Sequence, residues 1–236
     1  MKQVIDIKNL PQKKKIPLTG GIFIFLSFLF FINDQILSFI FFSFLILLLG
    51  LFSDLKHIKS ASSRFMIQIS IVLSFVIFND LQLMNTKIYI LDRLLSNEIF
   101  NYFFISFCIL IVVNGSNFFD GLNTLNIGYY LLISLIIFYL NGSNFVTINE
   151  IFINYILIVL IISFILNLLN QIYLGDAGSY LLGFTFSIFL INIYLENPQI
   201  SPFFIIVLLW YPSYETLFSI IRKNIMNKSP MSPDSN

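Results

Sequence analysis

The chain has 236 residues and a net charge of +1; 58% of the residues are hydrophobic and only 11% are charged. A soluble domain carries roughly a quarter of its residues as charged side chains, so this composition excludes a soluble globular protein. The near-neutral charge indicates no nucleic-acid partner, and the apolar runs predict an all-α integral membrane protein.

Eight apolar stretches have about the length needed to cross a bilayer core, which takes about 20 residues. They are separated by short polar turns, with no internal repeat and no soluble domain, so we expect one transmembrane domain over residues 1–236 and a polytopic bundle of about eight helices. In chain order the predicted spans are 17–32, 36–52, 65–84, 99–113, 122–140, 150–169, 180–195 and 201–221.

The basic residues predict the orientation. Eleven of the 13 Lys and Arg residues lie in residues 1–16, 53–64 and 222–236, which eight spans place on one side of the membrane. The two others, Lys87 and Arg93, fall on the opposite side. Because Lys and Arg are retained in the cytoplasm, we expect both termini, a basic segment at 1–16 and a tail at 222–236, to be cytoplasmic.

On this orientation three polar stretches, SDLKHIKS, NGSNFFDG and YLGDAGS, emerge on the cytoplasmic face. Each carries one aspartate at the end of an apolar helix: Asp54, Asp120 and Asp176. Converging carboxylates can hold Mg²⁺, which takes oxygen ligands and keeps part of its water shell for phosphates. Gly175 and Gly178 would let a ligand approach the backbone, and N–H groups at the following helix start would suit a phosphate. The alternative is an ordinary turn, for which Asp, Gly and Ser are the usual residues.

The PLTGG stretch at residues 17–21 follows directly after Lys13, Lys14 and Lys15. A proline at a helix start and two glycines that allow close helix packing explain it structurally. The functional alternative is a basic rim that attracts an anionic head group at the membrane surface.

Five stretches in this order, PLTGG, LGLFSD, NGSNFFDGLNTL, YLGDAGSYLLGF and WYPSYETLFSIIRKNIMNKSPMSPD, resemble the polyprenyl-phosphate N-acetylhexosamine-1-phosphate transferases over nearly the whole chain. The resemblance implies transfer of a sugar-1-phosphate from a UDP-sugar to undecaprenyl phosphate, with Mg²⁺ or Mn²⁺ as cofactor. That reaction initiates a lipid-linked cell-envelope polysaccharide, such as the O-antigen of lipopolysaccharide, at the cytoplasmic side of the bacterial inner membrane. Relatives often form homodimers.

The resemblance also implies roles for individual residues. We expect Asp54 and Asp120 to be catalytic and Asp176 to bind the metal. Substrate binding is expected from five residues: Lys15, Asn114, Asn117, Gly121 and Asn167.

The chain departs from the family pattern in several places. Ser53 and Asn123 stand where the family usually has second aspartates, and the family has a further span before PLTGG and a histidine-rich motif after the SPxxPD stretch. We therefore expect a product truncated at both ends, with a catalytically inactive remnant as the alternative. A membrane transporter is the rival from another class, but transporters hold their acids near the bilayer midplane rather than at one surface.

Overall fold

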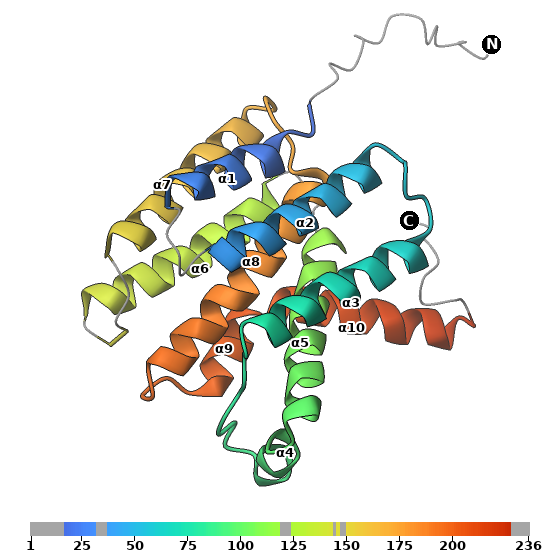
Figure 1. Cartoon of the computed structure of the whole chain (residues 1–236). Helices are drawn as coiled ribbons and strands as arrows, with labels where there is room; N and C mark the ends of the chain where they lie inside the picture. Colours follow the sequence, from blue (N-terminus) through green and yellow to red (C-terminus); the bar gives the residue numbers. More distant parts are fainter. Residues whose placement is uncertain (1–16, 32–36, 119–123, 144, 147–149, 228–236) are drawn as a thin grey trace, which may run out of the picture.

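The computed structural model describes residues 17–31, 37–118, 124–143, 145–146 and 150–227. These residues form helices and connecting turns without any strand, which confirms the all-α prediction (Figure 1). The elements in chain order are α1 (Gly20–Phe28), the 3₁₀ helix η2 (Leu29–Phe31), α2 (Leu37–Asp54), α3 (Ala61–Phe78), α4 (Tyr89–Leu95), α5 (Glu98–Phe118), α6 (Leu125–Gly142), α7 (Glu150–Leu168), α8 (Gly175–Glu196), α9 (Pro202–Leu208) and α10 (Trp210–Ile225).

Within the described residues, six helices, α2, α3, α5, α6, α7 and α8, are long and apolar enough to cross a membrane, which agrees with a polytopic membrane bundle. The first predicted span is present as α1, whose nine residues fall short of the same criterion. The last predicted span is broken into α9 and α10, which are bent by 71° at Leu209 and could together form a seventh crossing.

Helix α8 forms the centre of the bundle and packs against α1, α2 and α5 (Figure 1). Its apolar window is 78% buried, whereas that of α3 is 22% buried. The outer helices expose large apolar side chains, among them Phe78 on α3 and Phe138 on α6. A bundle that covers one central helix and leaves apolar side chains on its flanks is suited to lipid rather than to water.

Several of the described helix ends meet at one end of the bundle. The Gly20 N–H of α1 donates to the Tyr173 carbonyl before α8 (2.9 Å), and the Tyr173 N–H donates to the Pro17 carbonyl (3.0 Å). The Thr124 N–H before α6 donates to Asn167 Oδ1 near the end of α7 (2.9 Å). The end of α2, the start of α3 and the end of α5 reach the same α8 start through the contacts described below. We call this end of the bundle the polar end.

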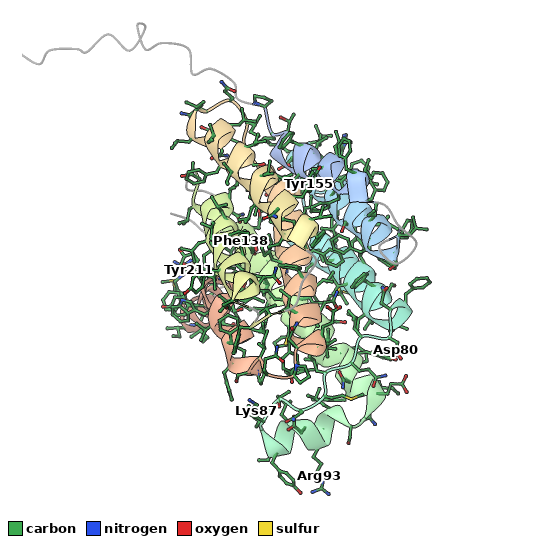
Figure 2. All side chains as sticks on the ribbon, turned by 90° about the vertical axis from the view of Figure 1, so that its left-hand side faces the viewer. Asp80, Lys87, Arg93, Phe138, Tyr155 and Tyr211 are labelled. Atoms are coloured by element: carbon green, nitrogen blue, oxygen red, sulfur yellow. The ribbon has the colours of Figure 1, made fainter. Side chains whose placement is uncertain are left out.

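The opposite end carries the connection from α3 to α5 and the short helix α4, which was not predicted. Lys87 and Arg93, the two basic residues predicted to face away from the others, both lie there (Figure 2). Lys56, Lys59 and Arg64, in contrast, lie between the end of α2 and the first turn of α3, at the polar end, so these five basic residues are divided as the sequence predicted. Which end faces the cytoplasm remains a prediction.

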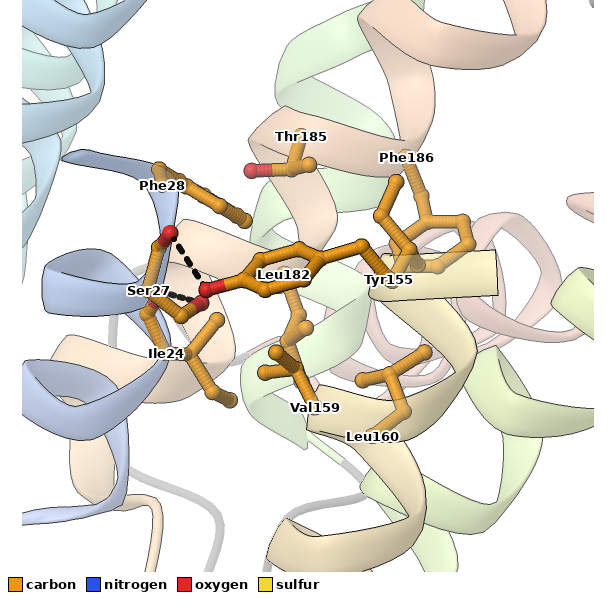
Figure 3. A pocket seen from close by; sticks show the side chains of 10 residues that line it. Ile24, Ser27, Phe28, Tyr155, Val159, Leu160, Leu182, Thr185 and Phe186 are labelled. Carbon is orange, nitrogen blue, oxygen red and sulfur yellow. Dashed lines mark hydrogen bonds between the residues drawn. The ribbon is translucent and has the colours of Figure 1, made fainter. Parts of the chain in front are cut away.

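A small cavity lies between α1, α7 and α8 (Figure 3). Its volume is about 10 Å³, enough for at most one water molecule. The Tyr155 hydroxyl crosses it and donates to the Ser27 carbonyl at 2.9 Å, which ties α7 to α1. This cavity is a packing feature of the bundle and is too small to hold a substrate.

Candidate active site

Asp54, the last residue of α2, caps the start of α8. Its Oδ1 accepts a hydrogen bond from the Asp176 N–H (2.9 Å) and its Oδ2 accepts one from the Ala177 N–H (3.2 Å). The first N–H groups of a helix have no partner within the helix, and a negative charge beside them is favoured by the helix dipole. The predicted catalytic residue Asp54 therefore fixes the position of the helix start that carries Asp176.

Two glycines let α2 and α8 approach this closely. A Cβ atom on Gly50 would lie 2.3 Å from the Ala177 Cα, so the two backbones are in direct contact. Gly175 has φ +65°, and a Cβ atom there would lie 2.6 Å from Asp54 Oδ2. Larger residues at either position would separate the helix start from the carboxylate that caps it.

The carboxylate of Asp176 is shared by two side chains. Ser53 Oγ donates a hydrogen bond to Asp176 Oδ2, and Arg64 Nη1 forms an ion pair with the same oxygen at 2.9 Å. Arg64 Nη1 also donates to Ser53 Oγ at 2.5 Å, so each of the three side chains contacts the other two. The side chains of Arg64 and Asp176 are 25% and 27% exposed, so a ligand from the aqueous phase can reach them.

The asparagines predicted to bind substrate lie in different surroundings. Asn117 on α5 points toward α8, where its Nδ2 donates to the Tyr180 hydroxyl (3.5 Å) one turn beyond Asp176. Asn114 donates instead to the Leu110 carbonyl of its own helix (2.8 Å). Of these two residues, the structure brings Asn117 toward the acidic residues.

Asn167 holds two connecting segments together. It is 4% exposed, its Oδ1 accepts the Thr124 N–H, and its Nδ2 donates to the Ile172 carbonyl at 3.1 Å. Both ends of the amide are thus used to join α7 to the residues before α6 and α8. Its predicted contact with substrate remains a prediction beside this structural role.

Three of the predicted site residues, Lys15, Asp120 and Gly121, lie outside the described residues.

Arg64 was not predicted as a site residue and was counted only as a charge in the loop. It belongs to α3, which starts earlier than predicted because Ser60 is its N-cap and accepts the Ser63 N–H (3.4 Å). The missed signal was the spacing of Arg64 and Gln68, two polar residues one turn apart in an apolar helix, a pattern that marks functional positions in membranes.

The described part of the chain has no group of three His, Cys, Asp or Glu side chains able to enclose a metal. Magnesium does not need such a group, since it is commonly held by one or two carboxylates and completes its shell with water and substrate phosphates. The partly exposed Asp176 carboxylate with the Ser53 hydroxyl beside it fits a cation bound in that way. The role of Asp176 as a metal ligand remains a prediction, since its Oδ2 is paired with Arg64 in this structure.

The chain is similar in sequence to two curated transferases. The chain is 28% identical over 226 residues to the undecaprenyl-phosphate alpha-N-acetylglucosaminyl 1-phosphate transferase of Thermotoga maritima. The matched region covers 94% of this chain and 66% of that protein. It is 28% identical over 196 residues to the probable undecaprenyl-phosphate N-acetylglucosaminyl 1-phosphate transferase of Bacillus subtilis, covering 81% of this chain and 54% of that protein. No solved structure matches the chain.

The chain thus spans between about half and two thirds of the length of these curated relatives. Residues 36–194 match the family described as glycosyl transferase family 4. That range holds Asp54, Arg64 and Asp176 and covers well over half of the sequence. The resemblance seen in the sequence motifs is confirmed: the chain belongs to glycosyl transferase family 4.

Proposed function

We propose that the protein transfers an N-acetylhexosamine-1-phosphate from a UDP-sugar to undecaprenyl phosphate. Membership of glycosyl transferase family 4 and the names of the two relatives support this reaction. The observation that carries it is the contact of Asp176, Ser53 and Arg64 at one end of an apolar bundle. A lipid phosphate at a membrane surface and a nucleotide from the aqueous phase could both reach that position.

The reaction brings two anions together. An oxygen of the lipid phosphate attacks the β-phosphorus of the UDP-sugar, the bond from that phosphorus to the bridging oxygen breaks, and UMP leaves. Mg²⁺ held by Asp176 would supply charge neutralisation at the pyrophosphate. The planar guanidinium of Arg64 is suited to bind phosphate oxygens in two-point contact. Asp54 keeps the start of α8, and with it Asp176, in place.

The positions of the two described site acids, Asp54 and Asp176, support this reaction. Asp54 ends α2 and Asp176 lies in the first turn of α8, so both are at a helix end rather than in mid-bundle. A transporter that binds its substrate within the membrane would hold such acids near the middle of its helices. The arrangement favours the transferase over the transporter.

We extend the proposal to the cellular setting. The site would face the cytoplasm of the bacterial inner membrane, because 11 of the 13 Lys and Arg residues lie in the three sequence segments predicted to share its side. The product would initiate a lipid-linked envelope polysaccharide of the O-antigen kind, with N-acetylglucosamine, the sugar in the names of both relatives, as the first sugar to test. A homodimer is part of the same proposal.

Replacement of Asp176 tests the proposed function. We expect Asp176→Asn to lower UMP release from UDP-N-acetylglucosamine, with undecaprenyl phosphate and Mg²⁺ present, by about 10²–10³-fold, the usual cost of losing a transition-state electrostatic contact. Glu196→Gln is the matched control, since Glu196 is an exposed acid at the opposite end of the same helix. Asn123→Asp, which restores the usual family residue, should be tolerated. Unchanged turnover and Mg²⁺ dependence in Asp176→Asn would disprove the metal role.

A further inference from the structure

The carboxylate predicted to bind a metal already has a cation beside it. Arg64 Nη1 lies 2.9 Å from Asp176 Oδ2, and that oxygen also accepts the Ser53 hydroxyl. A divalent cation that bound to Asp176 in this arrangement would lie within a few ångströms of the guanidinium. Two like charges so close repel each other strongly, even in surroundings that resemble water.

The guanidinium is also incompletely bonded in its present position. Its Nε is buried and makes no hydrogen bond within the described part of the chain. One turn further along α3, the side chain of Gln68 is 1% exposed; its amide lies beside the Tyr180 hydroxyl of α8, but neither its oxygen nor its nitrogen makes a well-formed hydrogen bond with a described group. Residues four apart lie on the same face of a helix, so Gln68 offers Arg64 an uncharged acceptor on that face.

We propose that Arg64 holds the place of the metal on Asp176. In the metal-free protein the guanidinium pairs with the carboxylate, and it must withdraw, toward Gln68 or toward a phosphate, before a divalent cation can bind. Ser53 favours this exchange because it is uncharged. A second acid at that position would keep the Arg64 guanidinium paired beside Asp176 after the metal had bound, and so prevent it from withdrawing.

The exchange has a thermodynamic consequence that rests on the proposed function. A phosphate that gives the guanidinium a new partner also frees Asp176, so binding of phosphate and of the divalent cation should each strengthen the other. The metal would then bind weakly until the sugar nucleotide arrives. Arg64 acts here as a positioning residue for the metal ligand, in addition to any contact that it makes with substrate.

The test measures Mn²⁺ binding by the purified full chain in detergent, with no nucleotide present, from the electron paramagnetic resonance signal of free Mn²⁺. A unit charge about 4 Å from a divalent cation changes its affinity by roughly tenfold or more, even at the dielectric constant of water. We therefore expect Arg64→Gln and Arg64→Met to bind Mn²⁺ roughly tenfold more tightly than the wild type. Arg64→Lys, which keeps the charge, should stay close to the wild type.

Arg93→Gln is the matched control. It removes the same charge from an exposed arginine on α4 at the opposite end of the bundle, and it should leave Mn²⁺ affinity unchanged (Figure 2). Asp176→Asn should abolish the binding that the neutral Arg64 variants strengthen.

Three results would overturn the proposal: unchanged or weaker Mn²⁺ binding in both neutral Arg64 variants, no measurable Mn²⁺ binding in any variant, or failure of both neutral variants to fold. The last result would make Arg64 a structural counter-ion that cannot leave Asp176. Because no sugar nucleotide is present, the outcome is separate from that of the UMP assay. Tighter binding without UMP release would support the exchange while rejecting the proposed reaction.

Discussion

A single methyl group at Gly50 should separate the two helices that build the candidate site. Gly50 lies one turn before Asp54 on α2, and a Cβ atom there would lie 2.3 Å from the Ala177 Cα and 2.6 Å from the Ala177 nitrogen. Ordinary van der Waals contact begins near 3.4 Å, so Gly50→Ala requires α2 and α8 to move apart by about 1 Å. Both contacts are with backbone atoms, so no side-chain rotation can relieve them.

The expected loss of stability follows from three contributions. Overpacking costs about 1–3 kcal/mol. The same displacement lengthens the hydrogen bonds from Asp54 to the Asp176 and Ala177 N–H groups, now 2.9 and 3.2 Å, beyond bonding distance, and each bond to a charged group is worth about 1.5–3 kcal/mol. Alanine is the better helix former by about 1 kcal/mol, which offsets only part of the loss. We expect a net destabilisation of about 3 kcal/mol or more.

The measurement is equilibrium unfolding of the purified protein in mixed micelles of detergent and dodecyl sulfate, followed by circular dichroism. Gly142→Ala is the control, because Gly142 ends α6 and nothing lies within 4 Å of a Cβ atom placed there, so its stability should equal or slightly exceed that of the wild type. If Gly50→Ala proved as stable as Gly142→Ala, the backbone contact between α2 and α8 would be wrong, and with it the placement of Asp54 beside Asp176.

Two further predictions concern the core and the orientation. Ser116 and Tyr130 are fully buried and hydrogen-bonded to each other, so Ser116→Ala should cost about 1–3 kcal/mol of stability by leaving the tyrosine hydroxyl unpaired. Adding Tyr130→Phe should restore most of that loss in the same unfolding assay. A double variant no more stable than the single one would refute this. Orientation can be tested in a chain with Cys108→Ser by adding an impermeant maleimide to intact cells. The reagent should label Ser96→Cys beside α4 but not Gln171→Cys before α8, although both positions are exposed. Labelling of Gln171→Cys from outside would reverse the proposed orientation.

Much of the architecture could be predicted from the sequence because it depends on local composition. An apolar run of about 20 residues is helical in a membrane whatever its neighbours, since each backbone group must find its hydrogen bond within the segment. That physical constraint accounts for α2, α5, α6 and α7, which agree with the predicted spans apart from their ends. It does not predict where a span bends, and the 71° break between α9 and α10 appeared only in the structure.

The sequence by itself determined that this is an all-α membrane protein of a recognisable transferase family and that Asp54 and Asp176 lie at helix ends, because these properties reside in composition and in short motifs. Only the tertiary structure decided that Asp54 caps α8, that Asn167 joins two connecting segments, and that Arg64 pairs with Asp176 from 112 positions away. Such contacts depend on which helices cross and how closely. Here that distance is set by the backbone of Gly50 on α2 in contact with the backbone of Ala177 on α8, a relation between two helices that neither helix contains alone.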